Sequence, residues 1–389
     1  MENRGVRFRL YPNLEQIQFF KQEVGNQRFV WNYFLDLNIK HYEKTKKFIF
    51  YNDMASKLPK LKEKFKFLKV GNSQSLQQTL KDLDKALKAC FKSKFGFPKF
   101  KKYNEKDSYR IPQHFILDKK KIVLPKLGKV TIKIHRDISK DTIKNITIVR
   151  DIDQWYASLC LEFTPIPLPK TKKELGIDLG SVRTYTDSNG KFKKPFREYK
   201  KVKKVKDKIE RVYKKLSWKF ECWKKRTGRI KLKKGEIVSN SYEKEKLKLQ
   251  KLYRKLRNLR LDFTHKTTFR IVRDNDKIVI EDLKLKNMTK SSKGTIEEPG
   301  KNVKAKSGLN RNLLDNNLGR LVNFLEYKCK WYDKELVKVD PKFTSQTCSC
   351  CGFKSKLNRN SQEEFKCKKC KFEINADHNA AINILNKAA

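Results

Sequence analysis

Three acidic residues occur in apolar segments of a strongly basic chain. Asp178 lies inside the run GIDLG, Glu281 ends the run KIVIE, and Asp377 opens the run DHNAAINIL. A buried carboxylate is costly unless it is paired, so three of them in core-forming segments favour a common partner. Carboxylate oxygens suit hard divalent cations, and two Mg²⁺ ions about 4 Å apart can promote phosphodiester hydrolysis. The three acids are therefore candidate ligands of a two-metal site.

Each acid also has an ordinary structural interpretation. It can cap a helix or pair with one of the abundant lysines, and for any one acid taken alone this interpretation is favoured. The combination weakens it, because two acids at the ends of predicted strands and a third on a late helix follow the order of an RNase H-like site. That arrangement predicts phosphodiester cleavage by two-metal catalysis.

A group of five cysteines precedes Asp377. Four of them form two CxxC pairs separated by fifteen residues, which is the spacing of a structural zinc site: Cys348, Cys351, Cys367 and Cys370. Cys350 is the spare thiol, since Cys351 is followed by Gly352, which permits the turn of a zinc knuckle. Disulfides are the alternative, but they are rare in intracellular chains. One structural Zn²⁺ ion is expected.

The charge of the chain predicts a polyanionic partner. Its 389 residues include 94 Lys and Arg against 43 Asp and Glu, a formal net charge of +51. Lysines alternate with apolar residues, and 38% of the residues are hydrophobic, so the charge belongs to folded surfaces rather than to a disordered tail. Binding to the phosphate groups of a nucleic acid would reduce the repulsion among these cationic side chains and release the counterions condensed on the nucleic acid. Nucleic acid is favoured well above an anionic membrane.

A membrane protein is not expected. No apolar run reaches spanning length, and the first residues lack the apolar centre of a signal peptide. A cytosolic or nuclear location with reduced cysteines follows as the expectation.

The elements that must position these residues follow in order along the chain. An alternating run over residues 6–10 predicts a strand, and helices are predicted after Pro12, one of them with the apolar stripe Leu76, Leu80, Leu83, Leu87 and Phe91. Short β-rich runs over residues 111–164 predict a small barrel or sheet that can include the first strand. The Pro-rich segment TPIPLPKTKK predicts a domain boundary near residue 170.

Several motifs in this order closely resemble those of the TnpB family, transposon-encoded proteins ancestral to type V CRISPR effectors. They are FRLYP, SLQQTLKDLDKALKACF, GFPKFK, GIDLG, EDLKLKNM, TSQTCSCCG and NADHNAAINIL, and they extend over nearly the whole chain. The resemblance implies an RNA-guided DNA endonuclease that binds a guide RNA and opens double-stranded DNA beside a short flanking motif. It makes Asp178, Glu281 and Asp377 the acids of one RuvC-type site with two Mg²⁺ ions.

The residue pattern and the resemblance together predict a multidomain α+β fold. A small β-barrel-like wedge domain carries a helical insertion, and an RNase H-like (RuvC) α/β nuclease domain with an inserted zinc ribbon follows. The expected boundaries are 1–11 for the first wedge strand, 12–105 for the helical recognition domain, 106–169 for the wedge β domain, 170–342 for the nuclease domain with a Lys-rich hairpin at 198–273, 343–374 for the zinc ribbon and 375–389 for the last nuclease helix.

Candidate contacts with nucleic acid are less specific. Gln74, Gln77, Gln78 and Lys81 fall outside the apolar stripe of their predicted helix, and glutamine can hydrogen-bond to base edges of the flanking motif. A solvated helix surface is the alternative. Arg311 is a candidate for stabilising charge at the scissile phosphate, or for a structural phosphate clamp.

Other functions remain open at this level. They are a miniature type V CRISPR effector, a nuclease-inactive RNA-guided DNA-binding regulator and a DNA-strand transferase. The three intact acids argue against the second, and the cysteine pairs immediately before the last acid argue against the third. Two departures from the family pattern, Lys371 for glycine and Ala376 for arginine, remove no metal ligand. The expected location is the cytoplasm of a prokaryote, with action at its DNA.

Overall fold

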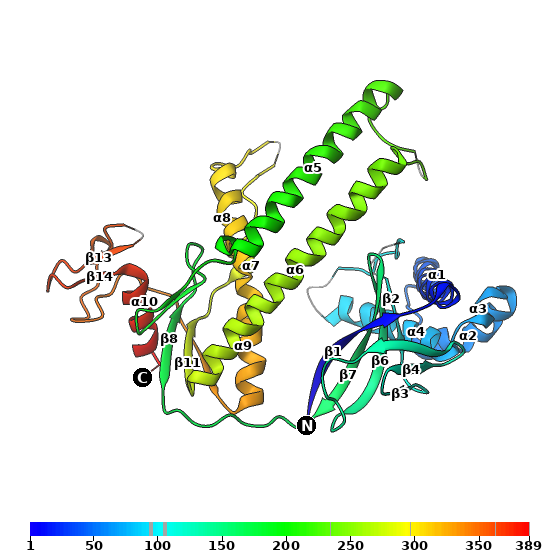
Figure 1. Cartoon of the computed structure of the whole chain (residues 1–389), viewed down its shortest axis with the longest axis horizontal. Coiled ribbons are helices and arrows are strands. Elements are labelled where there is room, and N and C mark those ends of the chain that lie inside the picture. Colours follow the sequence, from blue (N-terminus) through cyan, green and yellow to red (C-terminus); the bar gives the residue numbers. More distant parts are fainter. Residues whose placement is uncertain (93–95, 104–106, 234, 296, 362, 389) are drawn as a thin grey trace. The chain divides into compact units, whose positions relative to one another are not determined.

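The structure is a computed structural model that describes residues 1–388 except 93–95, 104–106, 234, 296 and 362 (Figure 1). The chain divides into two compact units, Met1–Thr164 and Pro165–Ala389. Two predictions fall outside what the structure describes. One is the domain boundary between residues 105 and 106, and the other is the burial of Phe91 in the apolar stripe. None of the helices in the described ranges is long and apolar enough to cross a bilayer.

Unit 1 is built on a seven-stranded sheet with the strand order β2-β6-β7-β1-β5-β4-β3. The first strand lies inside this sheet and pairs antiparallel with two strands that come much later in the chain. Its alternating residues Val6, Phe8 and Leu10 are buried, so this strand contributes directly to the core. The strands are β1 (Glu2–Tyr11), β2 (Ser108–Ile111), β3 (Ile116–Asp118), β4 (Lys121–Leu124), β5 (Gly128–Lys133), β6 (Thr142–Asp151) and β7 (Gln154–Phe163).

Between β1 and β2 the chain forms a helical layer with its own core. It consists of α1 (Leu14–Thr45), α2 (Tyr51–Lys64), α3 (Phe67–Val70) and α4 (Ser73–Lys92). Asn13 caps α1, because its side chain accepts from the backbone N–H of Gln16 while the Gln16 side chain accepts from the N–H of Asn13. The predicted leucine stripe of α4 is fully buried against α1 and α2: Leu76, Leu80, Leu83 and Leu87.

Unit 2 contains a five-stranded mixed sheet with the order β10-β9-β8-β11-β12. The strands are β8 (Glu174–Asp178), β9 (Tyr185–Asp187), β10 (Phe192–Lys193), β11 (Lys277–Glu281) and β12 (Glu335–Val339). Strands β8, β11 and β12 are parallel, with β12 at one edge of the sheet, while β9 and β10 add an antiparallel hairpin at the other. Buried parallel strands need cover on both faces, and this sheet has it.

The two faces of this sheet are covered by different helices (Figure 1). Ile278 and Ile280 of β11 pack with α6 (Asn240–Asp274) and α9 (Leu318–Tyr332). Val279 points to the other face and packs against Ile384 of α10 (Ala376–Asn386). The alternation of strand side chains therefore assigns each face its own helical layer.

A long helical hairpin occupies the range where the sequence predicts one. A short 3₁₀ turn (Phe196–Glu198) leads into α5 (Lys200–Thr227), and α6 returns antiparallel to it. Asp315 of α8 (Val303–Asn316) accepts hydrogen bonds from Lys206 and Arg260, so it ties both helices of the hairpin to α8. A single-turn helix, α7 (Leu285–Met288), follows β11.

The cysteine-rich segment lies between β12 and α10. It contains a 3₁₀ turn (Lys356–Asn358) and a two-stranded antiparallel pair, β13 (Glu364–Lys366) and β14 (Glu373–Asn375). Its own core is small and consists of Cys348, Phe365, Cys367 and Ala376, with Phe372 and Ile374 packed against it. So few apolar residues give little hydrophobic stabilisation, which makes a cross-link by metal valuable here.

Gly176 of β8 decides how closely α10 can approach the sheet. A Cβ atom at this position would lie 2.2 Å from the backbone oxygen of Ala381 and 2.8 Å from the Cβ of Leu385. The missing side chain therefore allows α10 to pack directly on β8. We expect Gly176→Ala to destabilise the protein by about 2 kcal/mol or more, because backbone of α10 must move.

Gly308→Ala is the matched control for this prediction. Gly308 lies within α8, and an added Cβ would meet nothing within 4 Å, so this change should be neutral or stabilise by up to about 1 kcal/mol. Urea unfolding followed by circular dichroism measures both variants. Equal stability of the two variants would contradict the close approach of α10.

Candidate active site and cysteine metal centre

Asp178 and Glu281 end two neighbouring parallel strands. In the pairing of β8 with β11, Ile177 lies opposite Ile280, and each strand ends at the next residue. The two carboxylates therefore leave the sheet at the same edge. Asp377 belongs to the first turn of α10, which packs on β8. The structure thus brings together three acids that are far apart in the sequence.

Burial makes ionisation of the three carboxylates unfavourable. Burial, and then the negative charges of Glu281 and Asp377, raise the pKa of Asp178 to about 7. Burial also raises the pKa of Glu281 and of Asp377. This is notable in a chain with a net charge of +51. A divalent cation would remove the mutual repulsion, and the donor set is oxygen only, which fits Mg²⁺.

Two arginines approach the site, and neither was predicted from the sequence. Arg359 Nη2 lies 3.4 Å from Asp377 Oδ1, and it comes from the segment between the two cysteine pairs. The positive charges of Arg359 and Arg183 oppose the rise in the pKa of Asp377 that burial causes. The predicted residue Arg311 is an exposed side chain of α8. An arginine between two CxxC pairs has no distinctive sequence signal, so only the contact reveals Arg359.

The start of α10 is fixed by two further contacts. The side-chain oxygen of Asn375 accepts from the backbone N–H groups of Asp377 and His378, which caps the helix. The imidazole of His378 packs on Gly190 in the turn between β9 and β10, with Nε2 3.1 Å from the oxygen of Ser188. Gly190 has a φ of +78°, so this turn favours glycine. The position of Asp377 is set by these contacts.

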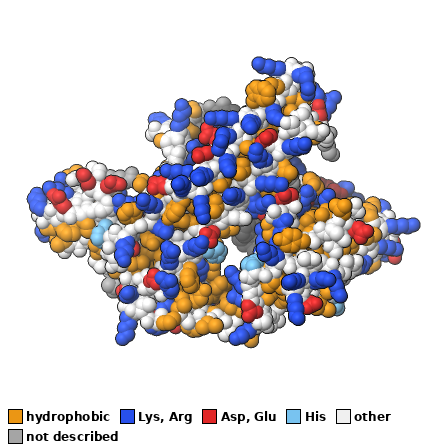
Figure 2. All heavy atoms as spheres, viewed as in Figure 1, with side chains coloured by type: hydrophobic (Ala, Val, Ile, Leu, Met, Phe, Trp, Pro, Cys, Tyr) orange, Lys and Arg blue, Asp and Glu red, His pale blue; other side chains and the backbone are white. Residues whose placement is uncertain are grey.

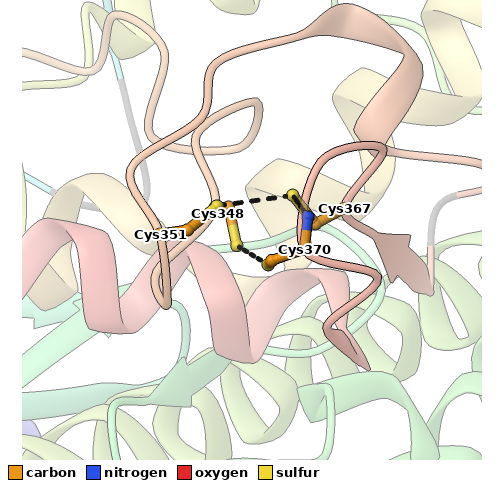
Figure 3. A group of neighbouring side chains, drawn as sticks. All are labelled: Cys348, Cys351, Cys367 and Cys370. Carbon is orange, nitrogen blue, oxygen red and sulfur yellow. Dashed lines mark hydrogen bonds between the residues drawn. The ribbon is translucent and has the colours of Figure 1, made fainter.

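The four predicted zinc ligands form one compact cluster (Figure 3). The sulfur atoms of Cys348 and Cys370 lie 3.7 Å apart and those of Cys351 and Cys367 lie 3.6 Å apart. In a tetrahedral site with Zn–S bonds of about 2.3 Å, neighbouring sulfur atoms lie about 3.8 Å apart. The structure includes Cys351 in the cluster and leaves Cys350 as an exposed free thiol. The geometry fits a metal such as zinc.

The cysteine cluster and the carboxylate site differ in compactness. Among the residues that the structure describes, the four thiols are the group whose ligand atoms all lie within 4.8 Å of one another. The three carboxylates do not converge as tightly. Ligands of a two-metal site must extend around two ions about 4 Å apart, so a wider spacing is compatible with that role.

The four candidate nucleic-acid contacts lie on α4 in different environments. Gln77 and Lys81 are exposed one helical turn apart, and Lys81 Nζ lies 5.3 Å from the ring centre of Tyr51. Gln78 donates from Nε2 to Asp82 Oδ1, and Gln74 has a buried side-chain oxygen. Gln77 and Lys81 are therefore the two that offer a free polar surface, and a contact with DNA stays a prediction for all four.

Three family models match the chain. A model described as a probable transposase covers residues 158–292, which include Asp178 and Glu281. A model described as the TNB domain of Cas12f1-like proteins covers residues 319–384, which include the cysteine cluster and Asp377. A model described as a helix-turn-helix domain covers residues 1–47. In this structure the last range forms a strand and one long helix, β1 and α1.

Full-length relatives decide the family. A putative RNA-guided DNA endonuclease of Escherichia coli, InsQ, is 36% identical over 387 residues, which cover 98% of this chain and 91% of the relative. The chain belongs to the TnpB family. A putative RNA-guided DNA endonuclease of Streptomyces pristinaespiralis is 28% identical and covers 98% of the chain and 88% of that protein. The resemblance to the TnpB family seen in the sequence motifs is thus confirmed.

Solved structures give a weaker likeness than the relatives of the TnpB family do. A Cas12f1-sgRNA-target DNA complex aligns over 100% of both chains with 19% sequence identity and a TM-score of 0.34. A mini-RNA-guided endonuclease, CRISPR-Cas_phi3, aligns over 73% of this chain and 57% of that one with a TM-score of 0.40. Both scores are too low to establish a shared fold.

The cysteine cluster yields a direct test by substitution. We expect Cys351→Ser to lose most of the bound metal, because three thiolates cannot close a tetrahedral site, and to lower the unfolding temperature of the protein. Cys350→Ser is the matched control and should keep about one zinc ion per chain. Metal content by mass spectrometry and thermal unfolding measure both effects. Full zinc in the Cys351 variant, or its loss in the Cys350 variant, would refute this ligand set.

Proposed function

We propose that this chain is an RNA-guided DNA endonuclease that cleaves target DNA at one RuvC-type site. The observation that carries the proposal is the convergence of Asp178, Glu281 and Asp377 in a member of the TnpB family. The relatives in Escherichia coli and Streptomyces pristinaespiralis, both named as putative RNA-guided DNA endonucleases, match over nearly their full length. A cluster of partly buried acids is otherwise unexpected in such a basic protein.

The domain assignment is part of this proposal. Residues 1–11 and 106–169 form the wedge domain, 12–105 the recognition domain, 170–342 and 375–389 the RNase H-like nuclease domain, and 343–374 the zinc ribbon. The strand ends that carry Asp178 and Glu281, and the α10 turn that carries Asp377, support the nuclease assignment. The four thiols at tetrahedral spacing support one structural Zn²⁺ ion in the ribbon.

The side chains of the site have distinct roles in cleavage. Two Mg²⁺ ions, when bound, supply an activated water and stabilise the leaving oxygen. Asp178 and Glu281 would hold them from the sheet edge and Asp377 from α10. Arg359, whose guanidinium reaches Asp377, carries the positive charge that can stabilise the phosphate as negative charge develops. Arg311 stays the second candidate for this task.

The distribution of charge supports guide RNA and double-stranded target DNA as partners. In α5 there are thirteen Lys and Arg against three acids, and in α6 eleven against four. Lys and Arg side chains cover much of this hairpin on the face drawn in Figure 2. In RNA-guided nucleases base pairing reads the sequence, while the protein binds backbone charge and helix shape. A surface of Lys and Arg side chains that binds phosphates without regard to sequence fits this mode of recognition.

A miniature CRISPR effector is the second candidate. The match of residues 319–384 to the TNB domain of Cas12f1-like proteins favours it specifically. The chemistry at the carboxylates would be the same, and only the source of the guide would differ. RNA transcribed from a transposon end or from a CRISPR array distinguishes the two candidates.

The proposal is tested by expressing the protein with its own downstream genomic DNA and sequencing the RNA that copurifies. We expect a defined RNA with a constant scaffold and a variable 3′ end, and Mg²⁺-dependent cleavage of double-stranded DNA that matches this end. Asp178→Ala, Glu281→Ala and Asp377→Ala should each reduce the cleavage rate by about 10³-fold or more, with target binding retained. Cleavage at the wild-type rate by any of them would contradict the site.

Asp282→Ala is the matched control for the acid substitutions. Asp282 follows Glu281 directly, but its carboxylate pairs with Lys284 at the surface. This variant should cleave within about twofold of the wild-type rate, because an exposed ion pair contributes little. Heterogeneous RNA in the purified protein, or none, would argue against guided cleavage as a whole.

Arg359 and Arg311 are separated by a comparison of their alanine variants. We expect Arg359→Ala to slow cleavage by about 10²-fold or more at saturating Mg²⁺, since the group beside Asp377 that can stabilise the phosphate is lost. Arg311→Ala should leave the single-turnover rate nearly unchanged if it serves only as a phosphate clamp, and should weaken DNA binding instead. The reverse pattern would assign the catalytic charge to Arg311.

A further inference from the structure

Thr344 connects the beginning of the cysteine-rich segment to Glu281. Its hydroxyl lies 2.6 Å from Glu281 Oε1 and 3.0 Å from the backbone oxygen of Pro341, and the residue is only 3% exposed. A hydroxyl has a single proton to donate, and both neighbours accept. The bond to an ionised carboxylate is the shorter and stronger of the two, so the proton is directed at Glu281. This contact fixes the rotation of the carboxylate.

Two asparagines of α10 hold the segment that carries Thr344. Asn383 Nδ2 donates to the backbone oxygens of Thr344, at 2.9 Å, and of Thr347, at 2.7 Å. Asn379 Nδ2 also donates to the oxygen of Thr347, at 2.8 Å. The two residues are one helical turn apart and both are buried, since Asn379 is 0% exposed and Asn383 is 8% exposed. Buried amides rarely remain without a partner, so these bonds fix the backbone at Thr344.

The same face of α10 reaches into the first cysteine pair. The oxygen Oδ1 of Asn379 accepts from the backbone N–H of Ser349 at 2.9 Å, and Ser349 lies between Cys348 and Cys351. The helix that carries Asp377 therefore also binds the first knuckle of the cysteine cluster. A continuous set of hydrogen bonds links Glu281 on β11, the segment 344–349 and α10.

We propose that Thr344 is a positioning residue for Glu281, and that Asn379 and Asn383 hold it there, so that the cysteine-rich segment orients a ligand of the nuclease site. The proposal rests on the assignment of Glu281 as a metal ligand. Carboxylates that bind metals are commonly oriented by a hydrogen bond from a neighbouring residue, and loss of such a bond costs about 10- to 100-fold in metal affinity or activity. A purely structural Thr344 would instead stabilise the turn through Pro341 alone.

Three variants separate these interpretations. Thr344→Val removes the hydroxyl and keeps the shape, while Thr344→Ser keeps the hydroxyl. Thr347→Val is the matched control, because its hydroxyl donates to the oxygen of Phe343 in the same turn and its backbone oxygen remains available to the asparagines. The guided complex of each variant is assayed for single-turnover cleavage, for target binding without divalent ions, and for Mn²⁺ affinity by electron paramagnetic resonance.

We expect Thr344→Val to slow cleavage and weaken Mn²⁺ binding by about 10- to 100-fold, with target affinity unchanged. Thr344→Ser and Thr347→Val should remain within about threefold of the wild type. If Thr344→Val fails to fold, the pair Thr344→Ala and Thr344→Ser tests the same point, since these two differ by the hydroxyl alone. Thr344→Ala should then show the larger loss of cleavage rate and of Mn²⁺ affinity.

Equal rates and equal Mn²⁺ affinities for Thr344→Val and Thr347→Val would overturn the proposal. So would a serine variant as impaired as the valine variant. A wild-type complex that cleaves no DNA would contradict the proposed function instead, and the Mn²⁺ affinities would still decide whether Thr344 positions Glu281.

Discussion

The burial of three carboxylates is the constraint on which unit 2 depends, and at Asp178 the charges of the other two add to its cost. Burial, and then the negative charges of Glu281 and Asp377, raise the pKa of Asp178 to about 7, and folding must offset both costs. The parallel register of the sheet fixes two of the acids at one edge. The third arrives because Gly176 lets α10 approach β8, and because Asn375 and His378 fix the first turn of that helix. A bound cation would stabilise the ionised form of these acids.

The cysteine-rich segment needs a metal ion for its own stability, and it also contacts two of the three acids. It has too small an apolar core to be stable by burial alone, so four thiols at tetrahedral spacing supply the cross-link when metal is bound. The same segment extends Arg359 to Asp377 and Thr344 to Glu281. Folding of this segment and the geometry of Asp377 and Glu281 are thus physically connected.

The charge distribution completes the physical account. The acids of the site are exceptions in a chain with more than twice as many Lys and Arg as Asp and Glu, and the long hairpin of α5 and α6 carries a large share of the cations. Such surfaces attract phosphate backbones without regard to sequence. Selectivity then has to come from base pairing, which agrees with few obvious base-reading side chains outside α4.

The sequence by itself determined the family, the basic character, the cysteine spacing and the candidate acids, because motif order, charge and CxxC spacing are local properties of the chain. It also predicted the leucine stripe of α4, since this stripe depends on neighbours within a few residues. Only the tertiary structure decided which later strands β1 pairs with, that Arg359 rather than the exposed Arg311 contacts Asp377, and that Thr344 and two asparagines of α10 join Glu281 to the cysteine cluster. These are contacts between segments far apart in the chain, and no local pattern of residue types specifies which distant partner a polar side chain will meet.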